Sequence, residues 1–190
     1  NAYDIPAAEF EQVIKKYKLD AYLISNPCNP TGNVMEGDDL RMYVQVASKN
    51  NCTLIFDEFY SHFIYENDKP GKGPVSAAEY VDDVNETPAI MIDGLTKSFR
   101  YPGWRIGWVI GPKNSIDVLN RAASAIDGGP SQPMMRAAMK VLDENYSNQE
   151  TTALRNVFCR KRNIMLDTLR NVGIDFLGSK GTFYLWGNIA

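Results

Sequence analysis

Four short apolar runs alternate along the chain with amphipathic segments, and this alternation constrains the fold more than any other feature. The runs are mostly apolar on both sides of the expected strand, which is typical of strands buried in a parallel sheet. They cover residues 21–25, 53–56, 89–93 and 108–110. Before the first run and between the first two, apolar residues recur at helical spacing over 10–17 and 40–47. The order of these elements predicts an α/β layered fold.

The last third of the chain has a different pattern. Clusters of turn-forming residues predict loops at 67–74 and 127–133. After the second loop the spacing of apolar residues predicts one helix and then a longer one, which ends at Gly173. The apolar and aromatic run 181–186 is expected to form a strand.

The length of the chain indicates how many domains it holds, and its charge indicates which class of partner it binds. With 190 residues, the chain is expected to hold one domain and a piece of another. Residues 1–150 are assigned to a large domain, and residues 151–190 to a long linking helix and the start of a smaller one. The net charge is −3, and no basic run is longer than 160–162. This composition argues against a nucleic-acid partner and favours a small molecule.

The sequence indicates no membrane association. No apolar stretch approaches the ~20 residues that cross a bilayer, and no secretory leader opens the chain, so a cytoplasmic location is expected. Cys28, Cys52 and Cys159 are too widely spaced for a disulfide framework or a zinc pair. His62 is the single histidine, and a surface or packing role is favoured for it over catalysis.

Chemically useful side chains follow three of the expected strands. Asn29 lies after the first strand, Asp57 and Tyr60 after the second, and Thr96 and Lys97 after the third. Ligands of open parallel sheets bind beyond the carboxyl ends of the strands. An amide, a carboxylate, a phenol, a hydroxyl and an amine are therefore expected around one pocket.

These residues lie in motifs that resemble the class I/II aminotransferases of fold type I, which use pyridoxal 5'-phosphate (PLP). The motifs are Asn29-Pro30-Thr31-Gly32, Asp57-x-x-Tyr60, and Thr96-Lys97 followed by Gly103-Trp104-Arg105-Ile106-Gly107. Asp57 follows Asn29 by 28 positions and Arg105 follows Lys97 by 8, as in the family. The resemblance implies a three-layer α/β/α fold with a mostly parallel sheet and the start of a smaller α+β C-terminal domain.

The resemblance implies catalytic roles for Lys97, Asp57 and Tyr60. Lys97 is the expected Schiff-base lysine and proton shuttle. Asp57 would keep the pyridine nitrogen of the cofactor protonated, which makes the ring an electron sink. In isolation Lys97 would more often be a solvated surface lysine, and the lesser alternative for Asp57 is a helix N-cap after a strand. Tyr60 is also compatible with a core aromatic whose hydroxyl reaches the surface.

The remaining cofactor contacts implied by the resemblance are Asn29, Thr96 and Arg105. Asn29 would join Tyr60 in donating to the phenolic oxygen of PLP, although by itself it is also a turn residue before Pro30. A cis peptide before that proline is compatible with the family. Arg105 and Thr96 would bind the phosphate. The family often carries serine three residues before the lysine, where this chain has Gly94.

The resemblance spans only the middle and later part of the family's subunit. The glycine-serine turn, the aromatic that stacks on the cofactor and the arginine that binds the substrate carboxylate have no counterpart in the chain. The chain is therefore expected to be a fragment that binds PLP weakly by itself. The family forms homodimers with active sites at the subunit interface, so a homodimer is implied for the intact protein.

Several reactions remain open at this point. The leading hypothesis is an aminotransferase that moves an α-amino group between an amino acid and a 2-oxo acid. A C–S lyase, a decarboxylase or an amino-acid cyclase would use the same residues with the same cofactor. An inactive relative is disfavoured because the functional groups keep their spacing. A nucleotide-binding protein is disfavoured because the chain has neither a GxGxxG nor a GxxxxGK[ST] motif.

Overall fold

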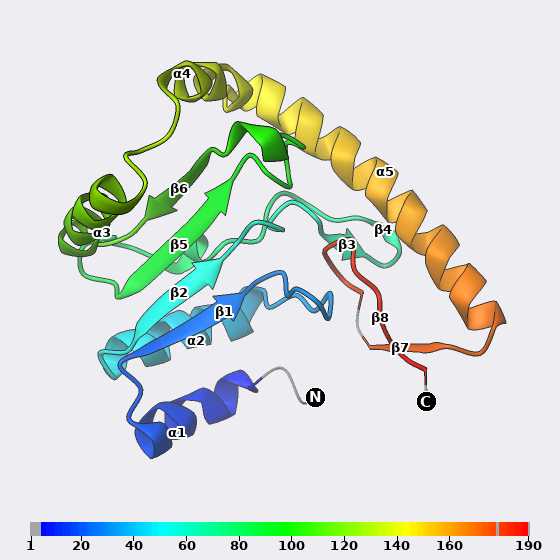
Figure 1. Ribbon diagram of the computed structural model, residues 1–190. Coiled ribbons are helices and arrows are strands. Elements are labelled where there is room, and N and C mark those ends of the chain that lie inside the picture. Colours follow the sequence, from blue (N-terminus) through cyan, green and yellow to red (C-terminus); the bar gives the residue numbers. More distant parts are fainter. Residues whose placement is uncertain (1–4, 178, 190) are drawn as a thin grey trace.

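A four-stranded sheet forms the centre of the molecule (Figure 1). The computed structural model describes residues 5–177 and 179–189. The strands are ordered β1-β2-β5-β6 across the sheet. Their bounds are Ala21–Ser25 for β1, Thr53–Asp57 for β2, Ala89–Gly94 for β5 and Gly107–Ile110 for β6. The predicted α/β fold with a mostly parallel sheet is confirmed, and each strand begins and ends within one residue of its expected limit.

The prediction that all four strands are parallel and buried is wrong for β6. β1, β2 and β5 are parallel, but β6 runs antiparallel to β5. The segment 95–106 between them contains only a three-residue 3-10 helix, Pro102–Trp104. Without a crossover helix the chain returns beside the strand that it has just left. Burial was also overestimated at the sheet edges, where Leu23 is 68% and Ile110 48% exposed.

Two amphipathic helices supply the main core. α1 (Ala7–Tyr17) and α2 (Gly37–Lys49) lie on one side of the sheet (Figure 1). The ring of Phe10 stacks on that of Tyr43, with 4.2 Å between their centroids. Phe10, Leu40, Leu54 and Phe56 are at most 1% exposed. This core holds the parallel strands at fixed register and thereby positions the loops at their carboxyl ends.

Two elements escaped the sequence analysis. α3 (Lys113–Ile126) has apolar residues at 116, 119, 123 and 126, so helical spacing was available to predict it. It buries none of its residues. In the segment expected to be a loop at 67–74, β4 (Lys69–Pro70) pairs with β3 (Tyr65–Glu66). The turn between them, Asn67 and Asp68, has left-handed backbone angles of 47° and 62°, a geometry that two-residue hairpins require.

A long helix spans one side of the molecule. α4 (Gln132–Val141) precedes α5 (Glu144–Asn171), and both helices confirm the predicted pattern (Figure 1). Asp143 begins α5 by accepting a hydrogen bond from the Tyr146 amide at 3.3 Å. The expected boundary between residues 150 and 151 falls inside α5, so the division into two domains stays a prediction.

The expected strand at 181–186 is wrong except at its last residue. β7 (Asp175–Leu177) pairs with β8 (Trp186–Asn188), and residues 182–185 form no strand. Thr182 has a left-handed φ of 64°, and its amide donates to the Phe63 carbonyl at 2.9 Å. Tertiary contacts thus override the strand propensity of this aromatic segment.

Candidate active site

The parallel strands bring the sequence-predicted residues to one edge of the sheet. Because β1, β2 and β5 are parallel, their carboxyl ends lie together. The Asn26 amide donates to the Asp57 carbonyl at 2.9 Å, which joins the ends of β1 and β2. The antiparallel β6 begins at the same edge, where Gly107 pairs with Gly94. Its direction therefore places Arg105, two residues before it, near this edge as well.

Lys97 and Tyr60 lie close together at this edge. Lys97 is half-buried, and its Nζ lies 5.5 Å from the centroid of the Tyr60 ring. On a second side it lies 5.4 Å from the ring of Phe183. An ammonium group over an aromatic face is attracted by the ring's negative charge density. The two rings hold this amine at the end of β5, unlike a fully solvated surface lysine.

The Tyr60 hydroxyl is paired inside the protein. It lies 2.9 Å from the hydroxyl of Tyr184, and Tyr60 is 3% exposed. Burial raises the pKa of the Tyr60 phenol above its usual value, and the Tyr184 hydroxyl and the charge of Asp57 add to the rise. Tyr60 therefore stays protonated at physiological pH and remains able to donate a hydrogen bond.

Phe183 and Tyr184 are site residues that the sequence analysis missed. Both were assigned to a strand with no role in the site. The Phe183 ring lies 5.2 Å from the ring of Tyr60 at an interplanar angle of 80°. Their aromatic character was visible in the sequence, but their proximity to Tyr60 depends on contacts across more than 100 positions.

Asp57 closes a turn at the end of β2. Its Oδ1 accepts a hydrogen bond from the Phe59 amide at 3.3 Å, and its side chain is half-buried. No helix begins at this point, so the alternative reading of Asp57 as a helix N-cap is wrong. The second carboxylate oxygen has no hydrogen bond from the described residues, which leaves it open to a donor.

Asn29, Thr96 and Arg105 share the edge but make no described side-chain contact with Lys97 or Asp57. Asn29 is exposed, its amide donates to Ser25 Oγ at 3.3 Å, and the peptide before Pro30 is cis, as the resemblance allowed. Thr96 is half-buried. The Arg105 guanidinium is exposed and donates to the Pro102 carbonyl at 3.0 Å.

Gly94 has no room for the serine that the family often carries at this position. A Cβ here would lie 2.7 Å from the Ile106 carbonyl oxygen, 2.9 Å from Gly107 Cα and 3.0 Å from a carbon of the Phe59 ring. Two of these neighbours are backbone atoms, one of Ile106, just before β6, and one of Gly107, the first residue of β6. The close approach of β6 to β5 therefore requires glycine and removes one candidate hydroxyl donor.

Gly94→Ala is expected to lower the free energy of unfolding by about 1–3 kcal/mol, because backbone must move to admit the methyl group. Gly103→Ala is the matched control, since nothing lies within 4 Å of its added Cβ. The control is expected to change stability by less than about 0.5 kcal/mol. Urea unfolding of the two variants measures the difference. Equal stabilities would contradict the close packing of β5 against β6.

Glu58 is a buried carboxyl group beneath this edge and Asp93 a half-buried one, and the sequence analysis overlooked both. Asp93 Oδ2 accepts from Ser61 Oγ at 3.1 Å, and Oδ1 accepts from the Gly94 amide at 2.6 Å. The pKa of Asp93 is raised to about 7, chiefly by burial and also by the charges of Glu58 and Asp57, although the hydrogen bonds from Gly94 and Ser61 lower it. Burial also raises the pKa of Glu58.

The raised pKa of Asp93 predicts a pH-dependent stability. Between pH 3.8 and about 7 the folded protein holds a proton that the unfolded chain releases. Stability is therefore largest below this window and falls as pH rises through it. Asp93→Asn cannot ionise, so at pH ~8 it is expected to be more stable than the unaltered protein by about 2 kcal/mol, with a much smaller difference at pH ~4.5.

Urea unfolding at the two pH values measures this effect. Asp38→Asn is the control, because the Asp38 side chain is 90% exposed and its removal should leave the pH dependence unchanged. An Asp93→Asn variant that is less stable by the same amount at both pH values would refute the protonation of Asp93.

His62 has a packing environment. Its pKa is lowered to about 4, chiefly by burial and also by the charge of Arg155. Its ring lies 6.2 Å from that of Phe99. The neutral, packed side chain agrees with the role favoured for it. Within residues 5–177 and 179–189, no group of three metal-ligating side chains is found, and the three cysteines are free.

The fold and the site together define an α/β protein with an amine, a phenol and a carboxylate at the carboxyl edge of a mostly parallel sheet. The family model for class I and II aminotransferases matches residues 2–190. The chain belongs to this family. No helix in the described part of the chain is long and apolar enough to cross a membrane.

The relatives named here are aminotransferases. An aspartate aminotransferase of Pyrococcus abyssi is 31% identical over 93% of this chain and 44% of its own length. An LL-diaminopimelate aminotransferase of Dehalococcoides mccartyi is 31% identical over 94% and 44%. The solved aromatic aminotransferase of Pyrococcus horikoshii is 29% identical with a TM-score of 0.81 and covers 94% of this chain. The chain spans less than half the length of these relatives.

Proposed function

We propose that the protein carrying this chain is an aminotransferase that moves an α-amino group between an amino acid and a 2-oxo acid with PLP. The observation that carries this proposal is the amine of Lys97, held 5.5 Å from the Tyr60 ring at the edge of the sheet. Tyr60 and Asp57 reach the same edge from β2. Membership of the aminotransferase family supports the assignment.

The functional groups present fit PLP. When bound, PLP supplies an aldehyde that captures amino groups and a ring that accepts electrons. Lys97 Nζ would form the covalent bond to the protein and then carry the proton to and from the substrate carbon. The open carboxylate oxygen of Asp57 would hold a proton on the ring nitrogen. The Tyr60 hydroxyl, protonated because of its burial, would donate to the phenolic oxygen.

Asn29, Thr96 and Arg105 would complete the binding of PLP. Asn29 is exposed at the edge, where its amide would donate beside Tyr60. Arg105 would turn its guanidinium from the Pro102 carbonyl to the phosphate, since a planar fork matches two phosphate oxygens. Because no side chain fits at position 94, the Thr96 hydroxyl and backbone amides would supply the neutral phosphate donors.

The proposed partners are an amino acid and a 2-oxo acid, and neither nucleic acid nor a membrane is included. A homodimer in the cytoplasm is proposed for the complete protein. Three of the relatives are named for amino-acid substrates: aspartate, LL-diaminopimelate and aromatic amino acids. These names support an α-amino acid as the substrate class, without selecting one amino acid.

Borohydride trapping tests the proposal. The complete natural protein is mixed with PLP, reduced with borohydride and digested, and the labelled peptide is mapped. We expect the label on Lys97. Lys97→Arg is expected to lose it, whereas Lys113→Arg is expected to keep it, because Lys113 is an exposed residue paired with Asp117. A label at another lysine would refute the assignment.

Product analysis then separates transfer from the other PLP reactions. The loaded protein is incubated with single amino acids and a 2-oxo acid acceptor. An aminotransferase forms equal amounts of a new amino acid and a new 2-oxo acid. Release of ammonia, carbon dioxide or a cyclic product without transfer would contradict the proposed reaction while leaving the PLP site intact.

A further inference from the structure

Residues 179–184, here called the strap, run from the C-terminal half of α5 to the candidate site. Backbone hydrogen bonds hold the strap to the segments that follow β1 and β2. Its Gly181 amide donates to the Gly32 carbonyl at 2.8 Å, and its Thr182 amide donates to the Phe63 carbonyl at 2.9 Å. The strap therefore contacts both the loop after β1 and the segment after β2.

The far end of the strap contributes two side chains to the site. The Tyr184 hydroxyl lies 2.9 Å from that of Tyr60. The Phe183 ring lies 5.4 Å from Lys97 Nζ. A displacement of the strap would thus alter the surroundings of the proposed Schiff-base lysine and of the phenol beside it.

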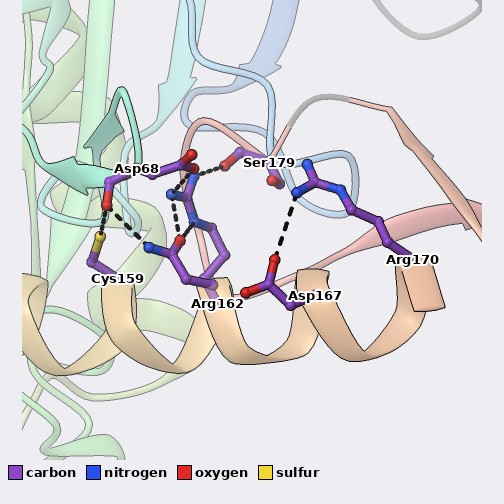
Figure 2. Close-up of polar contacts among 7 residues, drawn as sticks. Asp68, Cys159, Arg162, Asp167, Arg170 and Ser179 are labelled. Carbon is purple, nitrogen blue, oxygen red and sulfur yellow. Dashed lines mark hydrogen bonds and ion pairs between the residues drawn. The ribbon is translucent and has the colours of Figure 1, made fainter.

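The near end of the strap is fixed by Arg162 of α5. Arg162 Nη1 donates to the Ser179 carbonyl at 2.7 Å, and Nη2 donates to Asp68 Oδ1 at 2.8 Å. Figure 2 shows this guanidinium between the hairpin turn and the strap. The same group lies over the Tyr65 ring at 4.8 Å. Arg162 thereby joins three segments that are far apart in the sequence.

The hairpin end of this connection is bonded to α5 at more than one point. The Asp68 carbonyl accepts hydrogen bonds from Cys159 Sγ at 3.1 Å and from Asn163 Nδ2 at 3.0 Å (Figure 2). Both donors belong to α5, so the turn is bound to the helix through backbone and side chain together. Arg162 therefore acts on the strap from a fixed point.

Two observations indicate that the contacts of Arg162 fix the conformation of the strap. The Arg162 side chain is only 7% exposed, and a buried guanidinium is retained at a desolvation cost that an apolar side chain would avoid. Ser179 and Thr182 have left-handed φ angles of 71° and 64°. Non-glycine residues keep such angles only where the surrounding structure imposes them.

We propose that Arg162 is a positioning residue of the candidate site, which holds the strap so that Phe183 lies against Lys97 and Tyr184 against Tyr60. The effect of Arg162 on the reaction of Lys97 with PLP rests on the proposed function. The effect of Arg162 on the position of the strap does not, because every contact involved lies within this chain.

Hydrogen exchange tests the structural part in the complete natural protein without added PLP. In Arg162→Met, the amides of Gly181 and Thr182 are expected to exchange about tenfold faster or more, because local opening is easier. Exchange in β2 and β5 is expected to be unchanged. Arg170→Met is the matched control from the same helix, since Arg170 is 62% exposed and its nearest carboxylate oxygen, on Asp167, lies at 3.8 Å (Figure 2).

Unchanged exchange in the strap would overturn the proposal. Equal acceleration throughout the sheet would also overturn it, because Arg162 would then serve general stability alone. Arg162→Lys keeps the charge but cannot form the two-armed contact, and it is expected to give an intermediate exchange rate. If Arg162→Met does not fold, the proposal is tested with Arg162→Lys. Strap exchange in Arg162→Lys equal to that of the unaltered protein would again overturn the proposal.

The chemical part is tested by adding PLP and following the visible absorbance of its adduct. Arg162→Met is expected to form the adduct at Lys97 about tenfold more slowly, because a displaced amine meets the aldehyde less often in a productive orientation. The Arg170→Met control should match the unaltered protein. An unchanged rate in Arg162→Met would refute the link to the site. Failure of the unaltered protein to form an adduct would refute the proposed function and leave the exchange result standing.

Discussion

Replacement of Lys97 by alanine is expected to lower the transamination rate of the complete protein by about 10³-fold or more. On the proposed function the variant would lose both the covalent attachment to PLP and the proton carrier, and each contributes strongly to such reactions. Steady-state kinetics with an amino acid and a 2-oxo acid measures the loss, and borohydride trapping reports the missing adduct. The fold should persist, because Lys97 is half-buried and its amine lies against two aromatic faces, those of Tyr60 and Phe183.

The control for this variant is Lys113→Ala. Lys113 is 76% exposed, and its side chain pairs with Asp117 four residues further along α3. A surface pair of this kind contributes little to stability, so activity should remain within twofold of that of the unaltered protein. Retention of a tenth or more of the activity in Lys97→Ala would contradict the role assigned to this amine.

Asp57→Asn is expected to lower the turnover number by about 10²- to 10³-fold, the range found when one preorganised electrostatic contact is removed. A neutral amide cannot keep a proton on the pyridine nitrogen as a carboxylate does. Binding of PLP should weaken much less, since the proposed covalent bond through Lys97 would remain. Asparagine also keeps the oxygen that accepts from the Phe59 amide, so thermal unfolding should change little.

Kinetics on the loaded variant, with unfolding temperature measured in parallel, separates the chemical effect from a structural one. Asp38→Asn is the control, because it removes one negative charge at an exposed position on α2. A turnover number within threefold of the unaltered value in Asp57→Asn would refute the assigned role. A fall in unfolding temperature by more than about 5 °C would instead assign Asp57 a structural role in the turn.

The strands could be located from the sequence because each is a short apolar run between turn signals. The direction of β6 could not, because it depends on whether the intervening segment folds into a crossover helix or returns directly. The signal for α3 was present at residues 116, 119, 123 and 126. The α3 helix buries none of its residues, whereas helical apolar spacing usually indicates a helix face that packs against a core.

Some features of the candidate site could likewise be predicted from the sequence, and others could not. That Lys97 and Tyr60 meet follows from a general property of parallel sheets, whose carboxyl ends share one edge. The contribution of Phe183 does not, since it lies 123 positions after Tyr60 and reaches it through Arg162 and the strap. The ionisation of Asp93 was equally hidden, because its pKa is set mainly by burial.

The amino-acid sequence by itself determined the apolar periodicities, the motifs around Lys97 and Asp57, and through them the family. These depend on residues within a few positions of one another. The tertiary structure alone decided the antiparallel return of β6, the exclusion of a side chain at position 94, and the placement of the strap over the amine. Each of these features depends on which distant segments pack together. No local pattern of residues determines the free energy of such packing.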